Sequence, residues 1–180
     1  MKTYKEFMLE CTQLNEGGLA RQLSKAKTKT TGHISADRGS SESKNRTKRK
    51  GLEKDLKKKG IGYKKGVGEY KYKSDDGKEG TGREVSYQTS KPDKMSKRRF
   101  GKTMRRLGRK HGQESVITKK PNKPARLHDT ESKKPGKSVN LGKEKPGKHP
   151  KGSGQTGEKR TRGSKLSKSS NKDRNMHYDN

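Results

Sequence analysis

The sequence predicts a small α+β domain of marginal stability, with about two helices on a short-stranded sheet. We expect an N-terminal amphipathic helix before it and a long, disordered, basic tail after it. The 180 residues include 50 Lys+Arg and 20 Asp+Glu, a net charge of +30. Only 19% are hydrophobic, so most of the chain cannot bury a core. More than half of the large apolar residues lie in 31–130. This excludes folds built on several near-continuous apolar strands, and no run approaches the ~20 apolar residues that span a bilayer.

Within 31–130 the first expected elements are a strand and a helix. Residues 31–35 read as a short strand, and serines 40, 41 and 43 are candidate N-caps for a helix that runs to about Lys59. Leu52 and Leu56 lie four residues apart on one helical face, and Gly60 is the expected C′ residue.

A hairpin and a second helix follow. Tyrosines and glycines from Ile61 to Tyr72, a turn at 75–78 and a strand at 85–87 predict a glycine-interrupted hairpin. A helix is expected from about Lys94 to Lys110, because Phe100, Met104 and Leu107 recur at the spacing of a buried stripe. Short strands are expected at 115–118 and 125–127. The predicted order is β-α-β-β-α-β-β, with a thin core and hence marginal stability.

The segments on either side of this domain differ in composition. Residues 17–30 read as a linker. Residues 131–180 contain fourteen basic and five acidic residues, a net charge of +9, and repeat Lys-Pro-Gly-Lys twice. Proline and glycine disfavour helices and ladders, so we expect a disordered tail that is either a solubilising linker or a polyanion-binding segment, and its charge favours the second.

The density of positive charge predicts contact with a polyanion, and nucleic acid is the first candidate. No acidic residue lies between Lys94 and Lys110, where a merely solvated helix face normally carries both signs. Non-specific phosphate contact is therefore expected from residues of both helices: Lys54, Lys57, Lys58, Lys97, Arg98, Arg99, Lys102, Arg105, Arg106, Arg109 and Lys110. Tyr70, Tyr72 and Tyr87 could stack on bases, but packing on the sheet is the favoured role.

No motif of an active site stands out. The glycines at 60–68 do not form a phosphate-binding loop, and the five histidines are not paired at metal-ligand spacing. The single cysteine, Cys11, lies in the N-terminal segment, far from a plausible pocket. Asp37 and Arg38 are favoured as a turn or ion pair. We expect no catalytic residue, metal or cofactor, and thus no enzyme.

The first sixteen residues form a separate amphipathic segment. Its apolar side chains fall on one face at helical periodicity: Tyr4, Phe7, Met8, Cys11 and Leu14. The contiguous apolar run of a secretory signal is absent. A helix this short is marginal alone and should form when its apolar face docks on a partner; Gly17 and Gly18 then break it.

The opening Met1-Lys-Thr-Tyr-Lys-Glu-Phe7, with Glu10 after it, resembles the capsid-targeting peptide of internal head proteins of T-even-like tailed phages. The resemblance implies that residues 1–16 bring the chain to the prohead scaffold. It also implies that a prohead protease cuts after a glutamate preceded two residues earlier by Leu or Ile. Leu14-Asn15-Glu16 before Gly17 matches this rule. Met8-Leu9-Glu10 matches less well, since methionine replaces the preferred residue.

That family implies a location and partners for the mature chain. The protein would lie inside the virion, bound to packaged double-stranded DNA, and would enter the host cytoplasm with the genome, where it would counter a host defence through a host protein. Cleavage after Glu16 leaves 48 basic and 17 acidic residues, a net charge of +31 that favours retention by DNA. No membrane partner is expected.

Residues 31–130 also resemble a small uncharacterised domain of phages and bacteria. The resemblance rests on residues 34–38, a helix that ends near Leu56, residues 60–63 and 68–70, and Gln113-Glu-Ser-Val116. It implies no activity.

Two alternatives to the internal head protein remain. One is a non-packaged nucleic-acid-binding protein of the host cell interior, whose N-terminal helix docks a partner. The other is an ejected enzyme or enzyme inhibitor with a site that the sequence does not reveal.

Overall fold

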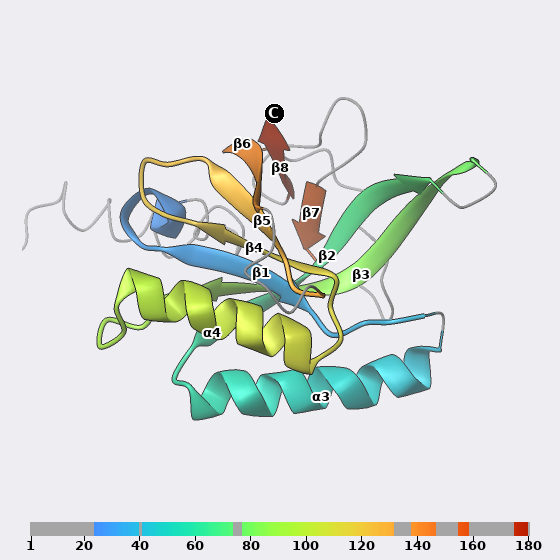
Figure 1. Ribbon diagram of the computed structural model, residues 1–180, viewed down its shortest axis with the longest axis horizontal. Coiled ribbons are helices and arrows are strands. Elements are labelled where there is room, and N and C mark those ends of the chain that lie inside the picture. The colour runs from blue at the N-terminus through green and yellow to red at the C-terminus, as the bar shows by residue number, and fades with distance from the viewer. Residues whose placement is uncertain are drawn as a thin grey trace, which may run out of the picture.

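The structure is a computed structural model that describes residues 24–39, 41–73, 77–131, 138–146, 155–158 and 175–179. Two long helices cover one face of an antiparallel sheet that curls into a closed barrel (Figure 1). In order around the barrel the described strands are β1 (Thr31–Ser35), β3 (Glu79–Ser90), β2 (Gly62–Lys73), β7 (Gln155–Glu158), β8 (Asn175–Asp179), β6 (Ser138–Pro146), β5 (Ala125–Asp129) and β4 (Ser115–Lys119). Strand β4 pairs with β1 and closes the ring. The predicted α+β class is confirmed.

The first helix has the predicted caps. Helix α3 (Glu42–Lys58) follows Ser41, whose side chain accepts a hydrogen bond from the Lys44 amide. Gly60 adopts φ +64°, a conformation that costs a residue with a Cβ atom more than it costs glycine. The Ile61 amide then reaches back to the Leu56 carbonyl, which ends the helix.

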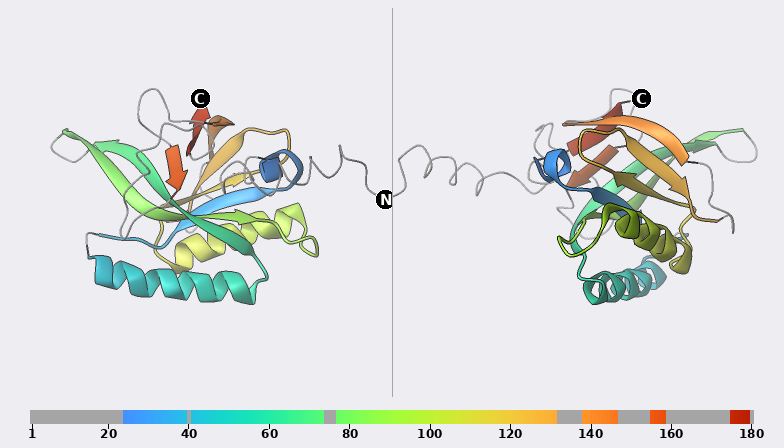
Figure 2. Two further views of the ribbon diagram at one scale, coloured as in Figure 1. Left: turned by 180° about the vertical axis from the view of Figure 1, so that it is seen from behind. Right: turned by 60° about the vertical axis from the view of Figure 1, so that its left-hand side comes forward.

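The second helix, α4 (Lys97–Lys110), begins three residues after the predicted start, because Ser96 caps it through the Arg99 amide. Phe100, Met104 and Leu107 are all buried against the sheet, as their spacing predicts. The two helices run in opposite directions on the same side of the barrel, and the views in Figure 2 agree.

The hairpin between the helices is longer than the sequence suggested. Strands β2 and β3 pair over twelve residues each, from Gly62 opposite Ser90 to Lys73 opposite Glu79. The order of elements from 31 to 130 is the predicted β-α-β-β-α-β-β.

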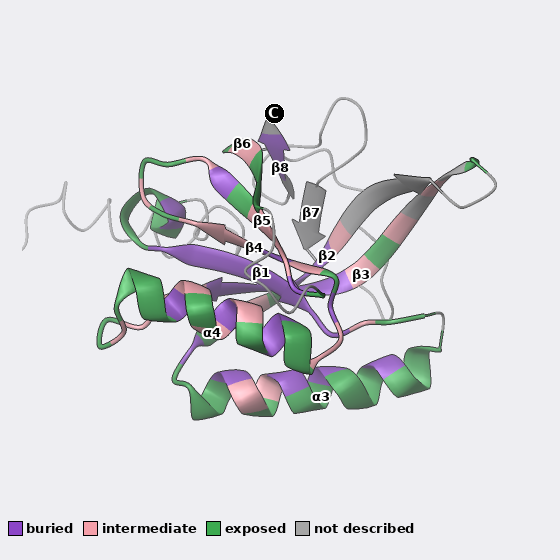
Figure 3. Cartoon of the chain, viewed as in Figure 1, coloured by how far each residue is buried: buried purple, intermediate pink, exposed green. Residues whose placement is uncertain are grey.

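The main core lies between the helices and the barrel wall. It joins Leu52 and Leu56 of α3 with the α4 stripe and with strand residues that include Ile34 and Tyr87. A smaller cluster packs Ala125 against Tyr178. Strand β1 is buried along its whole length (Figure 3), because the helices cover one of its faces and the barrel encloses the other.

The prediction of a disordered tail is wrong for three of its segments, which form β6, β7 and β8. Backbone hydrogen bonds need no apolar side chains, so a Lys/Gly-rich segment can pair with the otherwise open edges of β5 and β2. Tyr178 adds a buried apolar anchor. The other tail residues beyond Glu131 lie outside the described ranges.

The expected linker is also partly structured. Residues 24–28 are helical, and Ala26 is buried while its carbonyl accepts a hydrogen bond from Lys119 Nζ. The composition of this segment gave no sign of the contact, because it depends on a lysine 93 residues away.

Candidate nucleic-acid interface

The predicted phosphate-binding residues lie on the outer faces of α3 and α4. The apolar stripe of α4 turns toward the sheet, which leaves the other faces of that helix to its arginines and lysines. All the predicted residues are exposed except Arg105, which is half-buried. Both helices lie on the same side of the barrel (Figure 1), so the two predicted basic patches are on the same side of the molecule.

The end of α3, Met95 in the loop before α4, and α4 from Arg99 to Arg106 line a cavity of about 340 Å³. It is lined chiefly by cationic side chains, namely Lys58 and Lys59 from the end of α3 and Arg99, Lys102 and Arg106 from α4. Thr103 adds a hydroxyl group. We refer to these residues as the basic cleft. The sequence identified most of these cations but could not show that the two helices bring them together, and it gave no sign of Thr103.

Two predicted residues near the end of α4 have intramolecular partners instead. Lys110 Nζ lies 2.7 Å from an Asp55 carboxylate oxygen, and His111 Nε2 is 2.8 Å from the same oxygen. The hydrogen bond from Lys110 lowers the pKa of Asp55. Arg109 Nε donates to the Thr130 carbonyl oxygen. This end of α4 therefore joins the helix to α3 and to the segment after β5.

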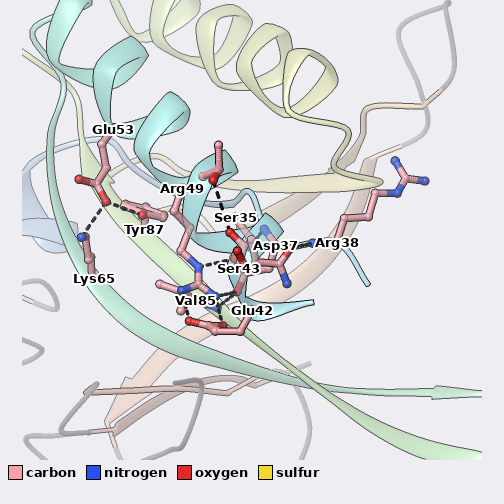
Figure 4. Close-up of polar contacts among 12 residues, drawn as sticks. Ser35, Asp37, Arg38, Glu42, Ser43, Arg49, Glu53, Lys65, Val85 and Tyr87 are labelled. Carbon is pink, nitrogen blue, oxygen red and sulfur yellow. Dashed lines mark hydrogen bonds and ion pairs between the residues drawn. The ribbon is translucent and has the colours of Figure 1, made fainter. Parts of the chain in front are cut away.

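A half-buried ion cluster centred on Arg49 joins the middle of α3 to the segment after β1 and to β3 (Figure 4). Arg49 Nε lies 2.5 Å from Asp37 Oδ1, and Arg49 Nη2 lies 2.7 Å from Glu42 Oε2. The second Asp37 oxygen accepts a hydrogen bond from the Val85 amide. The Glu42 hydrogen bond and the nearby carboxylates raise the pKa of Arg49 despite its burial. The favoured interpretation of Asp37 as an ion-pair residue is confirmed, with Arg49 as its partner.

Arg38 has a different role. Its Nη1 donates to the Gly112 carbonyl oxygen at 2.6 Å, which links the loop after β1 to the end of α4. Gln113 Nε2 donates to the Asp37 carbonyl oxygen in the same region. Both hydrogen bonds fix loop geometry, and the exposed Arg38 guanidinium also lies 3.9 Å from Glu131.

Tyr87 is buried in the core, in agreement with the packing role favoured from sequence. Its hydroxyl donates to Glu53 Oε1 at 2.8 Å, and Lys65 Nζ lies 2.7 Å from the same oxygen (Figure 4). Burial, together with Glu53, raises the pKa of Tyr87. The side chains of Tyr70 and Tyr72 lie outside what the structure describes.

The barrel interior contains a second polar cluster, which sequence reasoning missed. Glu144 of β6 lies 3.7 Å from Lys119 Nζ and 3.8 Å from His33 Nε2, and the His33 ring meets Tyr178 edge-on. Burial raises the pKa of Glu144 to about 7, although Lys119 opposes the shift, and burial lowers the pKa of His33 to about 4. One signal in the sequence could have indicated this cluster. Successive side chains of a strand point to opposite faces, so His33 lies on the face of β1 opposite Ile34, inside the barrel.

A further buried carboxyl group lies on β3. Burial raises the pKa of Glu84 to about 7, while a hydrogen bond from Ser35 opposes the shift. The carboxylates of Asp37 and Glu114 reinforce the rise. The protonation of Glu84 and Glu144 therefore makes the stability of the barrel depend on pH. Neither residue is assigned a catalytic role.

Several sequence predictions concern residues outside the described ranges. These include the apolar targeting face (Tyr4, Phe7, Met8, Cys11, Leu14) and the cleavage positions Glu16 and Gly17. Within the described ranges, no three or more His, Cys, Asp or Glu side chains gather in a way that would hold a metal ion. None of the helices described is long and apolar enough to cross a bilayer.

No protein-family model and no curated protein matches the chain. Among solved structures, a phage SAM lyase in complex with S-methyl-5'-thioadenosine is similar over 62% of this chain and 87% of the lyase chain. The two are 16% identical, with a TM-score of 0.37. At that TM-score too little of the two backbones coincides for the lyase to indicate either a fold or an activity for this protein.

Proposed function

We propose that this protein is an internal head protein of a tailed phage. Residues 1–16 bring it to the prohead scaffold, the prohead protease cuts between Glu16 and Gly17, and the mature chain is packaged with double-stranded DNA and ejected with it. The observation that carries the proposal is the opening heptapeptide, followed at Leu14-Asn15-Glu16 by the cleavage pattern of that family.

The charge of the mature chain supports the packaging step. Removal of residues 1–16 leaves a net charge of +31, and packaged DNA is a concentrated polyanion that retains such a protein. The exposed lysines and arginines of α3 and α4 offer a surface for non-specific contact with phosphates. Such contact requires no particular base sequence, which suits a protein packaged along a whole genome.

A small core suits ejection through a narrow tail, because a weakly stable domain unfolds at little cost. In the host cytoplasm the protein then counters a host defence by binding a host protein. The proposal assigns no catalytic step to the chain.

Mass spectrometry of the protein from purified particles, beside the same protein expressed alone, tests the proposal. We expect a mature N-terminus at Gly17 only in particles. Glu16→Gln should leave the full-length chain in the head, since the protease requires the glutamate. Asn15→Gln is the matched control and should be trimmed normally at Gly17, because the cleavage pattern specifies the residues on either side of it but not Asn15 itself. Intact Met1 chains in particles, or no protein there, would exclude packaging with processing.

A second candidate is a nucleic-acid-binding protein that is not packaged and acts inside the host cell. The basic cleft favours it, because a phosphate-binding surface works equally well outside a virion. Absence from particles together with salt-dependent nucleic-acid binding would establish this function instead. Salt-independent binding to one defined protein would favour the third interpretation, an ejected enzyme or inhibitor.

A further inference from the structure

The basic cleft concentrates positive charge without local compensation. Among the described residues, no carboxylate lies within 4 Å of the charged groups of Lys58, Arg99, Lys102 or Arg106, whereas Lys65 and Lys110 each have one at 2.7 Å. Cations that share a cavity without counter-ions repel one another, and this repulsion raises the free energy of the folded state. An anion bound among them offsets the repulsion.

The spacing on α4 aligns these cations. Arg99, Lys102 and Arg106 are three and four residues apart, so they form one stripe along the helix. At 1.5 Å per residue the stripe extends over roughly 10 Å. One strand of duplex DNA presents a phosphate about every 3.4 Å of helix axis, so the stripe spans roughly three phosphates.

The far wall of the cleft comes from the other helix. Lys58 and Lys59 lie at the end of α3 and face the α4 stripe across the cavity. Each guanidinium offers a planar fork of donors that matches phosphate oxygens, and the Thr103 hydroxyl adds a further donor.

From these observations we propose that the basic cleft is the main phosphate-binding site of the protein, and that it grips the backbone of one DNA strand between α3 and α4. The inference rests on the proposed function for its choice of DNA as the polyanion. It goes further in assigning binding to one cleft rather than to the summed charge of the chain. Because the cleft exists only while the two helices are packed together, DNA binding is coupled to the folded state.

Duplex DNA fits the cleft better than an anionic membrane does. A surface helix that inserts into lipid presents exposed apolar side chains beside its basic ones. On α4 the large apolar residues Phe100, Met104 and Leu107 are buried against the sheet. Helix α4 therefore offers charge and hydrogen-bond donors to a partner, which is what a phosphate backbone requires.

The coupling has a functional consequence. A ligand that binds only the folded state raises the free energy of unfolding, by about 2.7 kcal/mol at a hundredfold excess over Kd. Conversely, unfolding separates the two walls of the cleft and releases the strand. A domain that unfolds on its way out of the head therefore leaves its DNA at the same moment.

The test compares two quadruple variants of the full chain with equal reduction of charge. One removes the cleft cations (Lys58→Gln, Arg99→Gln, Lys102→Gln, Arg106→Gln). The control removes four cations from the first half of α3 (Lys44→Gln, Arg46→Gln, Lys48→Gln, Lys50→Gln), all of them exposed. Binding of a duplex of about 20 base pairs is measured between about 50 and 300 mM salt, the range over which phosphate neutralisation changes affinity most clearly.

We expect the cleft variant to bind at least about tenfold more weakly at low salt. Its salt dependence should be shallower by about 0.9 in log–log slope for each phosphate that the protein no longer neutralises. The control should stay within about threefold of the unmodified protein, because its lysines and arginines lie outside the cleft. Equal weakening of both variants would overturn the proposal, since net charge alone would then account for binding.

A second measurement keeps the proposal falsifiable if a variant folds poorly. Inorganic phosphate is titrated into the unmodified protein while amide chemical shifts are followed. Shifts concentrated at 58–59 and 99–106 support the cleft, and shifts spread over all basic segments refute it. The result is independent of packaging: the cleft can fail while the chain is still processed at Gly17, and the chain can bind DNA through the cleft without entering particles.

Discussion

Gly108, on the buried side of α4, tests how closely this helix packs on the barrel. A Cβ atom at this position would lie 2.6 Å from Val116 Cγ1 and 3.0 Å from Thr130 Cγ2. Carbon atoms normally approach to about 3.5–4.0 Å, so one side must move by roughly 1 Å. Val116 is buried, and the buried Thr130 hydroxyl is tied to the Gln113 carbonyl, so neither neighbour has room to move. We therefore expect Gly108→Ala to be destabilising.

The magnitude follows from two opposing effects. Alanine is favoured over glycine inside a helix by about 0.8–1 kcal/mol, and overpacking costs about 1–3 kcal/mol. Gly108→Ala should therefore lower the free energy of unfolding by up to about 2 kcal/mol. Gly101→Ala is the matched control, because it lies in the same helix and its Cβ would meet no atom within 4 Å. It should gain the full helix preference and stabilise the protein.

Urea unfolding and thermal melting of both variants measure the difference. The two should differ by about 1–3 kcal/mol, or at least about 2 °C in Tm for a chain of this size. Equal stabilisation by the two alanines would refute the reasoning. It would mean that α4 does not approach β4 as closely as the structure shows.

Two further predictions concern buried charges. Arg49→Met should lower the free energy of unfolding by about 3–5 kcal/mol, because it leaves the buried Asp37 carboxylate without its cationic partner. The double variant Arg49→Met/Asp37→Asn should recover part of that stability. Urea unfolding of both variants measures the two changes, and no recovery in the double variant would contradict the ion-pair explanation. Protonation of Glu84 and Glu144 stabilises the fold, because their folded pKa values of about 7 exceed the ordinary 4.5; this stability is complete below about pH 4.5 and is lost as the pH rises through 7. Since His33 has a lowered pKa, its contribution is instead lost as the pH falls from 6.5 toward 4, which offsets only one of the two glutamates. Urea unfolding should therefore show a stability that declines from about pH 4.5 to pH 7, most steeply between about pH 6.5 and 7. Glu144→Gln should flatten the decline between about pH 4.5 and 7 by on the order of 3 kcal/mol in total, and an unchanged slope would show that its carboxyl group is solvated.

The sequence by itself determined the elements that depend on neighbours along the chain. Serine and glycine at the ends of α3 and the 3.6-residue spacing of Phe100, Met104 and Leu107 are local signals, so α3 was found within about a residue at each end, and α4 was found with its start three residues too early. Short strands were likewise predicted at the positions of β1, β4 and β5. The basic residues of the candidate interface were visible too, because charge needs no tertiary context to be counted.

Only the tertiary structure decided which strands and side chains that lie far apart in the sequence come into contact. Strands β6, β7 and β8 close the barrel through backbone hydrogen bonds, which have no side-chain signature in a Lys/Gly-rich segment. The contact between His33 and Glu144 inside the barrel depends on that closure. In the same way, Lys58 and Arg99 line one cavity only because two antiparallel helices pack on the same face of the sheet. The amino-acid composition determines the net charge of this protein, and the packing of α3 against α4 determines which of its cationic side chains line the basic cleft.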